Sequence, residues 1–156
     1  MAVSGERSYN RYQFADLGGL APPGEGNNML DEAIAELKFN EQNLIPAVVQ
    51  DATSGELLMV AWMNPASLKS TVETGKTHFW SRSRQKYWMK GEESGHTQEV
   101  VSISTDCDKD VLRVLVHQTG GACHTGYRSC FSWHLRDGRW VEEGEKLFDP
   151  KATYKK

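Results

Sequence analysis

The residues best suited to chemistry gather in one stretch of the sequence, from Thr105 to Phe131. This stretch holds every cysteine of the chain, three aspartates at alternate positions, and a histidine that directly follows a cysteine: Cys107, Cys123, Cys130, Asp106, Asp108, Asp110 and His124. Thiolate and imidazole are ligands for zinc, whereas carboxylates bind hard cations such as Mg²⁺. We therefore predict that this stretch binds metal ions and carries the chemistry of the protein.

The cysteine spacing favours a catalytic zinc site over a structural one. No two cysteines stand two residues apart, as they do in a zinc knuckle. Three thiolates leave one position of a tetrahedral Zn²⁺ open for water, whose pKa zinc lowers from about 15.7 to about 7. His124 could instead complete a closed set of three cysteines and one histidine. Because it directly follows Cys123, we prefer His124 as a group that transfers protons beside the metal.

The aspartates form a second candidate metal site. In the preceding segment Val101, Ile103 and Thr105 alternate with serines. If this strand pattern continues, Asp106, Asp108 and Asp110 project to one face and Cys107 to the other. Three carboxylates on one face repel each other unless solvent separates them or a hard cation such as Mg²⁺ or Ca²⁺ neutralises them. The alternative is an acidic turn between two strands without any ion.

Two upstream segments have the composition of an anion-binding site. They contribute positive charge, hydroxyl groups, and glycines that let backbone N–H groups approach a phosphate; the candidates are Ser81, Arg82, Ser83, Arg84, Lys90, Gly91, Ser94 and Gly95. Trp80 could stack on a purine or belong to the core. These residues are predicted to bind an anionic small molecule.

Short strands and helices must position these groups. Leu30, Ala33, Ile34 and Leu37 have helical spacing, and a second helix is predicted from the Asn64–Pro65 start signal to Gly75. Strands are predicted over 44–50 and 57–62 as a hairpin, over 77–81, 86–90, 99–105 and 111–118, and, from a weaker signal, over 132–135. Pro46 indicates that its strand lies at a sheet edge or begins there. The predicted fold is α+β and β-rich: one curved mixed sheet with two short helices.

Length and charge limit the organisation and the partners. The 156 residues suit one domain, predicted over 29–140, between a flexible N-terminal arm (1–28) and a polar C-terminal tail (141–156). A net charge of −3 gives no reason to expect nucleic acid, and no apolar run approaches the ~20 residues that span a bilayer. No signal peptide is evident at the N-terminus, and three cysteines cannot all pair within one chain, so a cytoplasmic protein is expected.

Four ordered motifs resemble those of the phosphoribosyl-AMP cyclohydrolase family, which performs the third step of histidine biosynthesis. They are FWSRSR at 79–84, WMKGEESG at 88–95, DCDKD at 106–110 and ACHTGYRSCF at 122–131. The resemblance covers roughly residues 37 to 135, and the consistent order and spacing of four motifs make it specific. No second enzymatic domain of the kind fused to some family members is expected in the remaining residues, so the form is predicted to be monofunctional.

The resemblance implies an activity and the roles of the site residues. The reaction would be hydrolytic opening of the adenine ring of 1-(5-phosphoribosyl)-AMP at the N1–C6 bond. Zinc would be bound by Cys107, Cys123 and Cys130, and magnesium by Asp106, Asp108 and Asp110. The family further implies an obligate homodimer with active sites at the interface, in which Cys107 comes from one chain and Cys123 and Cys130 from the other.

Two other functions would use similar residues. A zinc-dependent nucleobase or nucleoside deaminase would need a His-x-Glu or Cys-x-Glu element and a Pro-Cys-x-x-Cys element, and the sequence has neither. A non-catalytic zinc-binding module would have no use for the aspartates or for the Arg, Ser and Gly segments. Both alternatives are therefore less favoured than the hydrolase.

Overall fold

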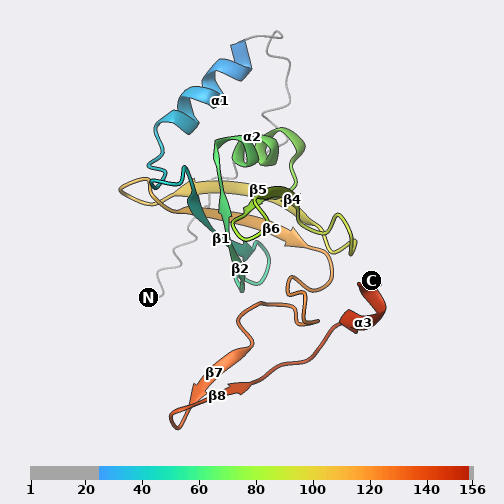
Figure 1. Cartoon of the computed structure of the whole chain (residues 1–156). Coiled ribbons are helices and arrows are strands. Elements are labelled where there is room, and N and C mark those ends of the chain that lie inside the picture. Colours follow the sequence, from blue (N-terminus) through green and yellow to red (C-terminus); the bar gives the residue numbers. More distant parts are fainter. Residues whose placement is uncertain (1–24, 155–156) are drawn as a thin grey trace, which may run out of the picture.

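A computed structural model describes residues 25–154 of the chain, and the N-terminal arm expected over 1–28 lies outside them up to residue 24 (Figure 1). The helices and strands, in chain order, are α1 (Glu25–Ala35), β1 (Ile45–Asp51), β2 (Leu57–Met63), α2 (Pro65–Thr74), β3 (His78–Ser81), β4 (Lys86–Met89), β5 (Gln98–Thr105), β6 (Leu112–Gln118), β7 (Trp133–Arg136), β8 (Arg139–Glu142) and α3 (Pro150–Thr153). Among the described residues no helix has the length and apolar character needed to cross a bilayer.

Six strands form the main sheet in the order β4-β3-β2-β1-β6-β5. The central pair β1–β6 is parallel and the other pairs are antiparallel, so the sheet is mixed, as predicted. Register shifts between Val49 and Gln50 in the β1–β2 pairing, and between Val100 and Ser102 in the β5–β6 pairing, add local twist and help to curl the sheet. The curved mixed sheet expected from the sequence is confirmed.

The predicted hairpin over 44–62 is strands β1 and β2, but β1 is not at an edge. It lies between β2 and β6 in the sheet centre. Pro46 is tolerated because it is the second residue of the strand, and the pairing with β6 begins only at Ala47. Of the two explanations for the proline, its place at the beginning of the strand is therefore the correct one.

Helix α2 begins and ends where the sequence places it. The side chain of Asn64 accepts a hydrogen bond from the backbone N–H of Ser67, whose hydroxyl accepts one from the backbone N–H of Asn64. Pro65 occupies the first turn, and Gly75 ends the helix in the left-handed conformation with φ 66°. The helix packs on the sheet through the buried residues Ser67, Leu68 and Thr71.

The core lies between the sheet and the two longer helices. Strand residues dominate it, and Phe79, Ile45, Leu58, Met63 and Leu112 are its largest fully buried side chains. Among the described side chains of α1, only Ile34 is fully part of this core. Ion pairs of Asp31 with Lys69, and of Glu36 just after the helix with Lys109, connect this segment to its neighbours. Figure 1 shows α1 and α2 on the same side of the sheet.

Beyond β6 the chain leaves the main sheet. Strands β7 and β8 form a separate two-stranded sheet that extends away from the six-stranded one, and the chain then returns to end in α3 (Figure 1). Strand β8 and helix α3 were not predicted from the sequence. The loop of residues 119–132, between β6 and β7, contains Cys123, His124 and Cys130.

Candidate active site

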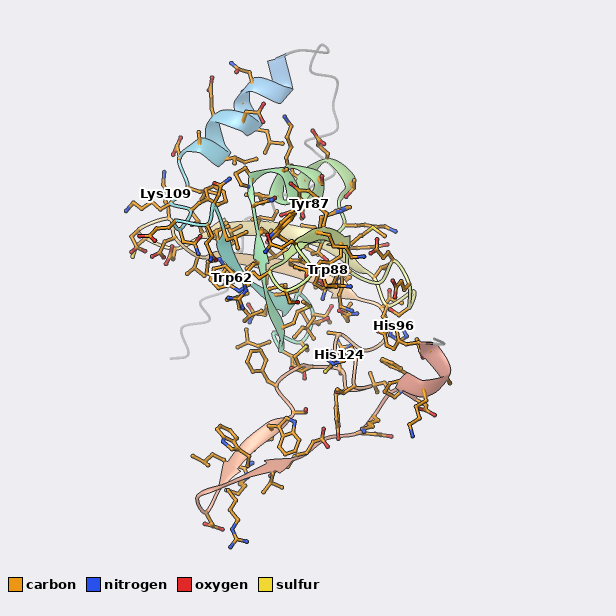
Figure 2. All side chains as sticks on the ribbon, in the orientation of Figure 1. Trp62, Tyr87, Trp88, His96, Lys109 and His124 are labelled. Atoms are coloured by element: carbon orange, nitrogen blue, oxygen red, sulfur yellow. The ribbon has the colours of Figure 1, made fainter. Side chains whose placement is uncertain are left out.

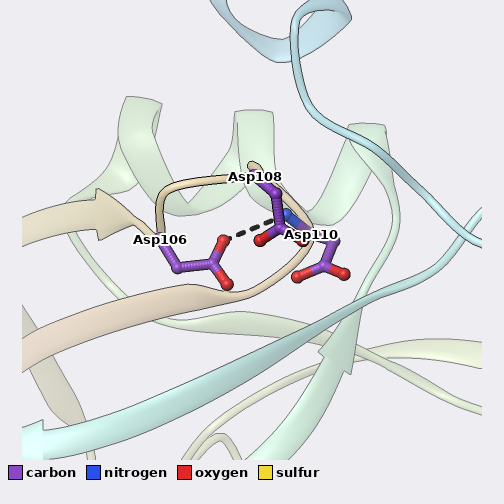
Figure 3. A group of neighbouring side chains, drawn as sticks. All are labelled: Asp106, Asp108 and Asp110. Carbon is purple, nitrogen blue, oxygen red and sulfur yellow. Dashed lines mark hydrogen bonds between the residues drawn. The ribbon is translucent and has the colours of Figure 1, made fainter.

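The three aspartates converge, although not by the strand geometry expected. Strand β5 ends at Thr105, and residues 106–110 form a turn before β6. The backbone N–H groups of Asp110 and Val111 donate to Oδ1 of Asp106 at 3.1 and 3.3 Å, and Lys109 turns the chain with φ 62°. One carboxylate oxygen from each of Asp106, Asp108 and Asp110 lies within 4.8 Å of the other two (Figure 3).

Electrostatic interactions within this cluster change the pKa values of Asp106 and Asp110. Partial desolvation and the negative charges of Asp108 and Asp106 raise the pKa of Asp110 above its ordinary value of 3.8. For Asp106 desolvation acts in the same direction, but the backbone N–H groups of Asp110 and Val111 outweigh it and lower its pKa. A bound divalent cation would remove the repulsion, and all three side chains are exposed and accessible to one.

The loop that carries Cys123 and Cys130 is folded on itself by backbone hydrogen bonds. Ala122 donates to the carbonyl of Arg128 at 2.8 Å and Cys123 to that of Tyr127 at 3.1 Å. The backbone N–H of Cys130 donates to the carbonyl of Leu58 in β2 at 2.7 Å. The last of these bonds places Cys130 beside β2, and we call residues 122–130 the cysteine loop.

A buried carboxylate anchors the cysteine loop to the β1–β2 turn. Asp51, only 4% exposed, accepts from Nη2 of Arg128 at 2.8 Å and from the backbone N–H groups of Thr53 and Ser54 at 3.0 and 2.8 Å. Burial alone would raise the pKa of Asp51, but these hydrogen bonds and the guanidinium charge outweigh it and hold the pKa below 3.8. Nε of Arg128 also donates to Glu56 at 3.1 Å.

His124 and Cys130 share a cavity of about 360 Å³ with Lys90. The Lys90 side chain is buried, with 6% of the residue exposed, and no carboxylate among the described residues forms an ion pair with it. Burial lowers its pKa, while negative charge on Cys130 and Cys123 acts to raise it. The ammonium thus lies where thiolates, or the anionic groups of a ligand, would be its counter-charges.

The surroundings of the two thiols in the cysteine loop suit a bound cation. Although part of Cys130 reaches solvent, burial and the neighbouring Cys123 raise the pKa of its thiol to about 12, despite the opposing charge of Lys90. Cys123 is buried, and its Sγ lies 2.9 Å from the hydroxyl of Thr125. Two neighbouring soft sulfur donors, one of them with a raised pKa that a bound cation would lower, fit a zinc ion. The cluster of carboxylates likewise fits a hard cation.

Cys107 does not join the other two cysteines within one chain. It lies in the turn before β6, whereas Cys123 lies beyond the other end of that strand. Because β6 spans seven residues, its ends are roughly 20 Å apart at a rise of ~3.3 Å per residue. In Figure 2 Lys109, from the turn that contains Cys107, and His124 lie in different parts of the molecule.

The predicted anion-binding residues divide between two cavities. Trp80, Ser81, Arg82, Ser83 and Arg84 line a larger one of about 740 Å³. Lys90, Gly91 and Ser94 line the cavity of His124 and Cys130, and Arg84 lines both. Gly95 is not among the lining residues of either cavity.

Several residues of the predicted anion-binding segments also make contacts that shape the protein itself. Gly91 has φ +81°, and a Cβ there would meet the carbonyl carbon of His96 at 2.5 Å, so the glycine is needed for the 91–96 loop to close. The guanidinium of Arg82 lies 4.7 Å from the ring centre of Trp62. Trp80 packs edge-on against Tyr87 at 4.9 Å and is half-buried, at the cavity wall rather than in the core.

Sequence reasoning missed several residues that line the smaller cavity. Met59 and Trp88 come from β2 and β4, and Tyr154 comes from the last described position of the chain. The apolar runs of the strands gave no sign of which of their residues face a cavity. Tyr154 lies outside every motif, and only its aromatic character near the C-terminus could have drawn attention to it.

Comparisons with known proteins agree on one family. The model of the family described as "Phosphoribosyl-AMP cyclohydrolase" matches residues 59–132. A protein of that name from Pelobacter propionicus is 56% identical over 123 residues, which cover 78% of this chain and 98% of the relative. Namesakes from Geobacter sulfurreducens and Haloquadratum walsbyi are 60% and 52% identical, covering 72% and 80% of this chain and 91% and 92% of their own lengths.

Proposed function

Because the chain belongs to the phosphoribosyl-AMP cyclohydrolase family, we propose that its residues open the adenine ring of 1-(5-phosphoribosyl)-AMP with water activated by zinc. The protein is an enzyme, a hydrolase of histidine biosynthesis. In the proposed reaction water adds to C6 of the purine and the N1–C6 bond breaks. The observation that carries the proposal is the cavity in which His124 and Cys130 lie beside the buried Lys90.

We assign the zinc ligands to Cys123 and Cys130 of one chain and Cys107 of another. When bound, zinc supplies a Lewis acid that makes water nucleophilic at neutral pH. His124 is exposed in the same cavity and is the proposed proton carrier, accepting the proton of the attacking water or delivering one to N1 as it departs. Its exposure in this cavity, and its place directly after Cys123 in the sequence, support this role over that of a fourth ligand.

The two cavities are proposed to hold the substrate between them, with its reacting purine in the smaller cavity and a phosphate in the larger one. Arg84 lines both, so its guanidinium can contact a ligand that extends from one to the other. Arg82 and the serines of the 81–84 segment would bind one phosphate in the larger cavity. Lys90 would place its positive charge near the reacting end of the substrate.

Magnesium is proposed at Asp106, Asp108 and Asp110. The support is the convergence of their oxygens and the repulsion that raises the pKa of Asp110. In a dimer this turn, with Cys107 in it, would lie next to the partner's cysteine loop. A cation there could also meet the phosphates of the substrate.

A homodimer is proposed because one chain supplies an incomplete set of cysteines. The roughly 20 Å between the ends of β6 keeps Cys107 from an ion held by Cys123 and Cys130 of the same chain. The β7–β8 sheet gives a second argument, because a two-stranded hairpin alone is at best marginally stable in water. A second copy of the chain would both complete the zinc site and cover the hairpin. A cytoplasmic location is proposed with it, in keeping with three free cysteines.

The test is incubation of the purified protein with phosphoribosyl-AMP while ultraviolet absorbance follows the opening of the purine. We expect turnover that a strong chelator abolishes and that added Zn²⁺ restores. A parallel assay for ammonia separates hydrolytic ring opening, which releases none, from deamination. An unchanged purine in the presence of zinc and magnesium would refute the proposed function.

A further inference from the structure

The C-terminal segment, residues 146–154, returns from the β7–β8 hairpin to the cysteine loop. The backbone N–H of Leu147 donates to the carbonyl of Gly126 at 2.7 Å, and Lys146 forms an isolated bridge with Tyr127. The ammonium of Lys146 lies 5.3 Å from the ring centre of Tyr127. The segment is therefore attached to the loop that presents Cys123 and Cys130, although the whole β7–β8 hairpin separates the two in sequence.

Two glycines let the segment approach the loop this closely. A Cβ on Gly126, which has φ +103°, would lie 2.5 Å from the carbonyl oxygen of Phe148. A Cβ on Gly121 would lie 2.8 Å from the Phe148 ring. That ring also packs against the ring of His96, with centres 4.3 Å apart. Because even one methyl group would not fit at Gly126, the segment fits the loop as part of the folded site.

The single turn of α3 then directs Tyr154 to the cavity. Asp149 caps the turn by accepting from the backbone N–H of Lys151 at 2.9 Å, and the N–H of Tyr154 donates to the carbonyl of Pro150 at 2.9 Å. The Tyr154 ring meets Phe148 edge-on at 6.4 Å. Half-buried, it lines the same cavity as Lys90, His124 and Cys130.

We propose that Tyr154 is a substrate-binding residue whose ring packs against the purine of the substrate. The proposal rests on the proposed function. An aromatic ring beside a flat heterocycle binds it by stacking, with little dependence on the hydroxyl group. Trp88 of β4 lines the same cavity, so aromatic side chains from two distant parts of the chain are available to the purine. Phe148 acts through Tyr154, by holding the segment against the loop.

The test compares three variants in steady-state kinetics with phosphoribosyl-AMP. Tyr154→Ala removes the ring, Tyr154→Phe keeps it, and Lys151→Ala alters an exposed side chain of α3 as a matched control. We expect Tyr154→Ala to raise KM about 10-fold while kcat changes less than about 3-fold, which is the size and pattern of a lost stacking contact. Tyr154→Phe and Lys151→Ala should match the wild type, and zinc content and Tm should be equal in all four proteins.

The outcomes separate this inference from the proposed function. If the wild type turns over the substrate and Tyr154→Ala has the same KM, the proposed role of Tyr154 is overturned and the proposed function is left intact. A Tyr154→Ala protein that loses zinc or melts earlier would also overturn it, in favour of a purely structural role. Wild-type protein that leaves the purine closed would overturn the proposed function and this inference together.

Discussion

The buried charge of Lys90 indicates which groups the smaller cavity can hold. A lysine that is 6% exposed, without a carboxylate partner among the described residues, is costly unless something else balances its charge. The groups that act on it are the thiols of Cys130 and Cys123, each of which raises its pKa when ionised. The positive charge of Lys90 is therefore balanced only when the cavity holds thiolates or an anionic ligand. The proposed zinc site and the proposed phosphorylated substrate would supply both.

Substitution of His124 tests its proposed role in proton transfer. In the His124→Asn variant we expect kcat to fall by about 100-fold or more, because general acid–base catalysis contributes ~10²- to 10⁴-fold. Zinc content should stay that of the wild type, since the proposed ligands are all cysteines. The measurement is kcat from ultraviolet absorbance together with metal analysis of the same sample.

Two results would contradict this role. Unchanged turnover would remove His124 from the mechanism. Loss of zinc along with activity would make it a ligand, the alternative that the sequence left open. His117→Asn is a suitable control, because His117 lies on β6 outside the residues that line the two cavities.

Some residues of the candidate site could be predicted from the sequence, and others could not. Ligand chemistry is local, so Asp106, Asp108 and Asp110 could be picked out by type and spacing, and they do converge. The reason for their convergence was wrong, because the hydrogen bonds to Asp106 and the positive φ of Lys109 depend on where β5 ends. Tyr154 could not be predicted, because its position depends on the return of the chain to Gly126, a contact between residues far apart in sequence.

Among the elements, the cysteine loop depends on the β1–β2 turn. Arg128 connects the two, through Asp51 on one side of its guanidinium and Glu56 on the other. Cys130 is positioned by the same hairpin, since its backbone N–H donates to Leu58. Any change that loosens the turn is thus expected to move Cys130, one of the proposed zinc ligands.

Substitution of Asp51 tests how much its buried charge stabilises the protein. Its pKa is lowered in the folded protein from an ordinary value of 3.8. The stabilisation is therefore fully present above the unfolded-state pKa and is lost as the pH falls through the lower, folded one. In Asp51→Asn we expect the free energy of unfolding at pH 7 to fall by about 1.5–3 kcal/mol, the range for hydrogen bonds to a buried charged group.

Urea unfolding at several pH values tests this. The difference between wild type and Asp51→Asn should be largest near neutrality and should shrink below about pH 4. Glu56→Gln is the matched control, because Glu56 bonds the same arginine from an exposed position, and it should cost less than about 1 kcal/mol. A difference that stays constant down to low pH would show that the Asp51 charge does not matter.

The elements themselves were largely predictable because their signals are local. Asn64, Pro65 and Gly75 fix both ends of α2, and the apolar runs of 44–50 and 57–62 are β1 and β2. The central place of β1 was not evident, since its parallel pairing with β6 joins residues far apart in the sequence. Strand β8 was missed because its four residues are exposed and carry no alternating apolar pattern.

For the whole molecule, the β7–β8 hairpin is a part that a single chain leaves exposed. In this hairpin Leu135 lies opposite Trp140, and Trp133 lies opposite Glu142. Cross-strand partners share a face, so Trp133, Leu135 and Trp140 form one apolar face, and each is more than half exposed. A surface of this kind is expected to meet a partner, and the proposed partner is a second copy of the chain.

Replacement of Trp140 by lysine should weaken the dimer. We expect the dissociation constant to rise about 30-fold or more, as for loss of a central tryptophan from an interface, with activity falling in parallel at low protein concentration. Arg139→Ala, at the neighbouring position on the other face, should have little effect. Sedimentation velocity over a range of concentrations measures both, and a Trp140→Lys protein that stays dimeric would exclude this face from the interface.

Mixed dimers test whether the zinc site is shared between chains. Cys107→Ser and Cys130→Ser should each be inactive as homodimers, because every site lacks one sulfur. When the two variants are expressed together, about half of the dimers should be mixed, and in each mixed dimer one site combines Cys107 of the Cys130→Ser chain with the intact loop of the other. About a quarter of the wild-type activity and zinc content should therefore return.

The control for this experiment is Cys123→Ser expressed together with Cys130→Ser. Both changes fall on the cysteine loop, so each site of a mixed dimer still receives a damaged loop, and no pairing of the chains restores it. Recovery in the first mixture but not in the second would be possible only if one chain supplies Cys107 and its partner supplies the loop. A complete cysteine set within one chain would instead leave both mixtures equally inactive, because neither variant could then repair the other.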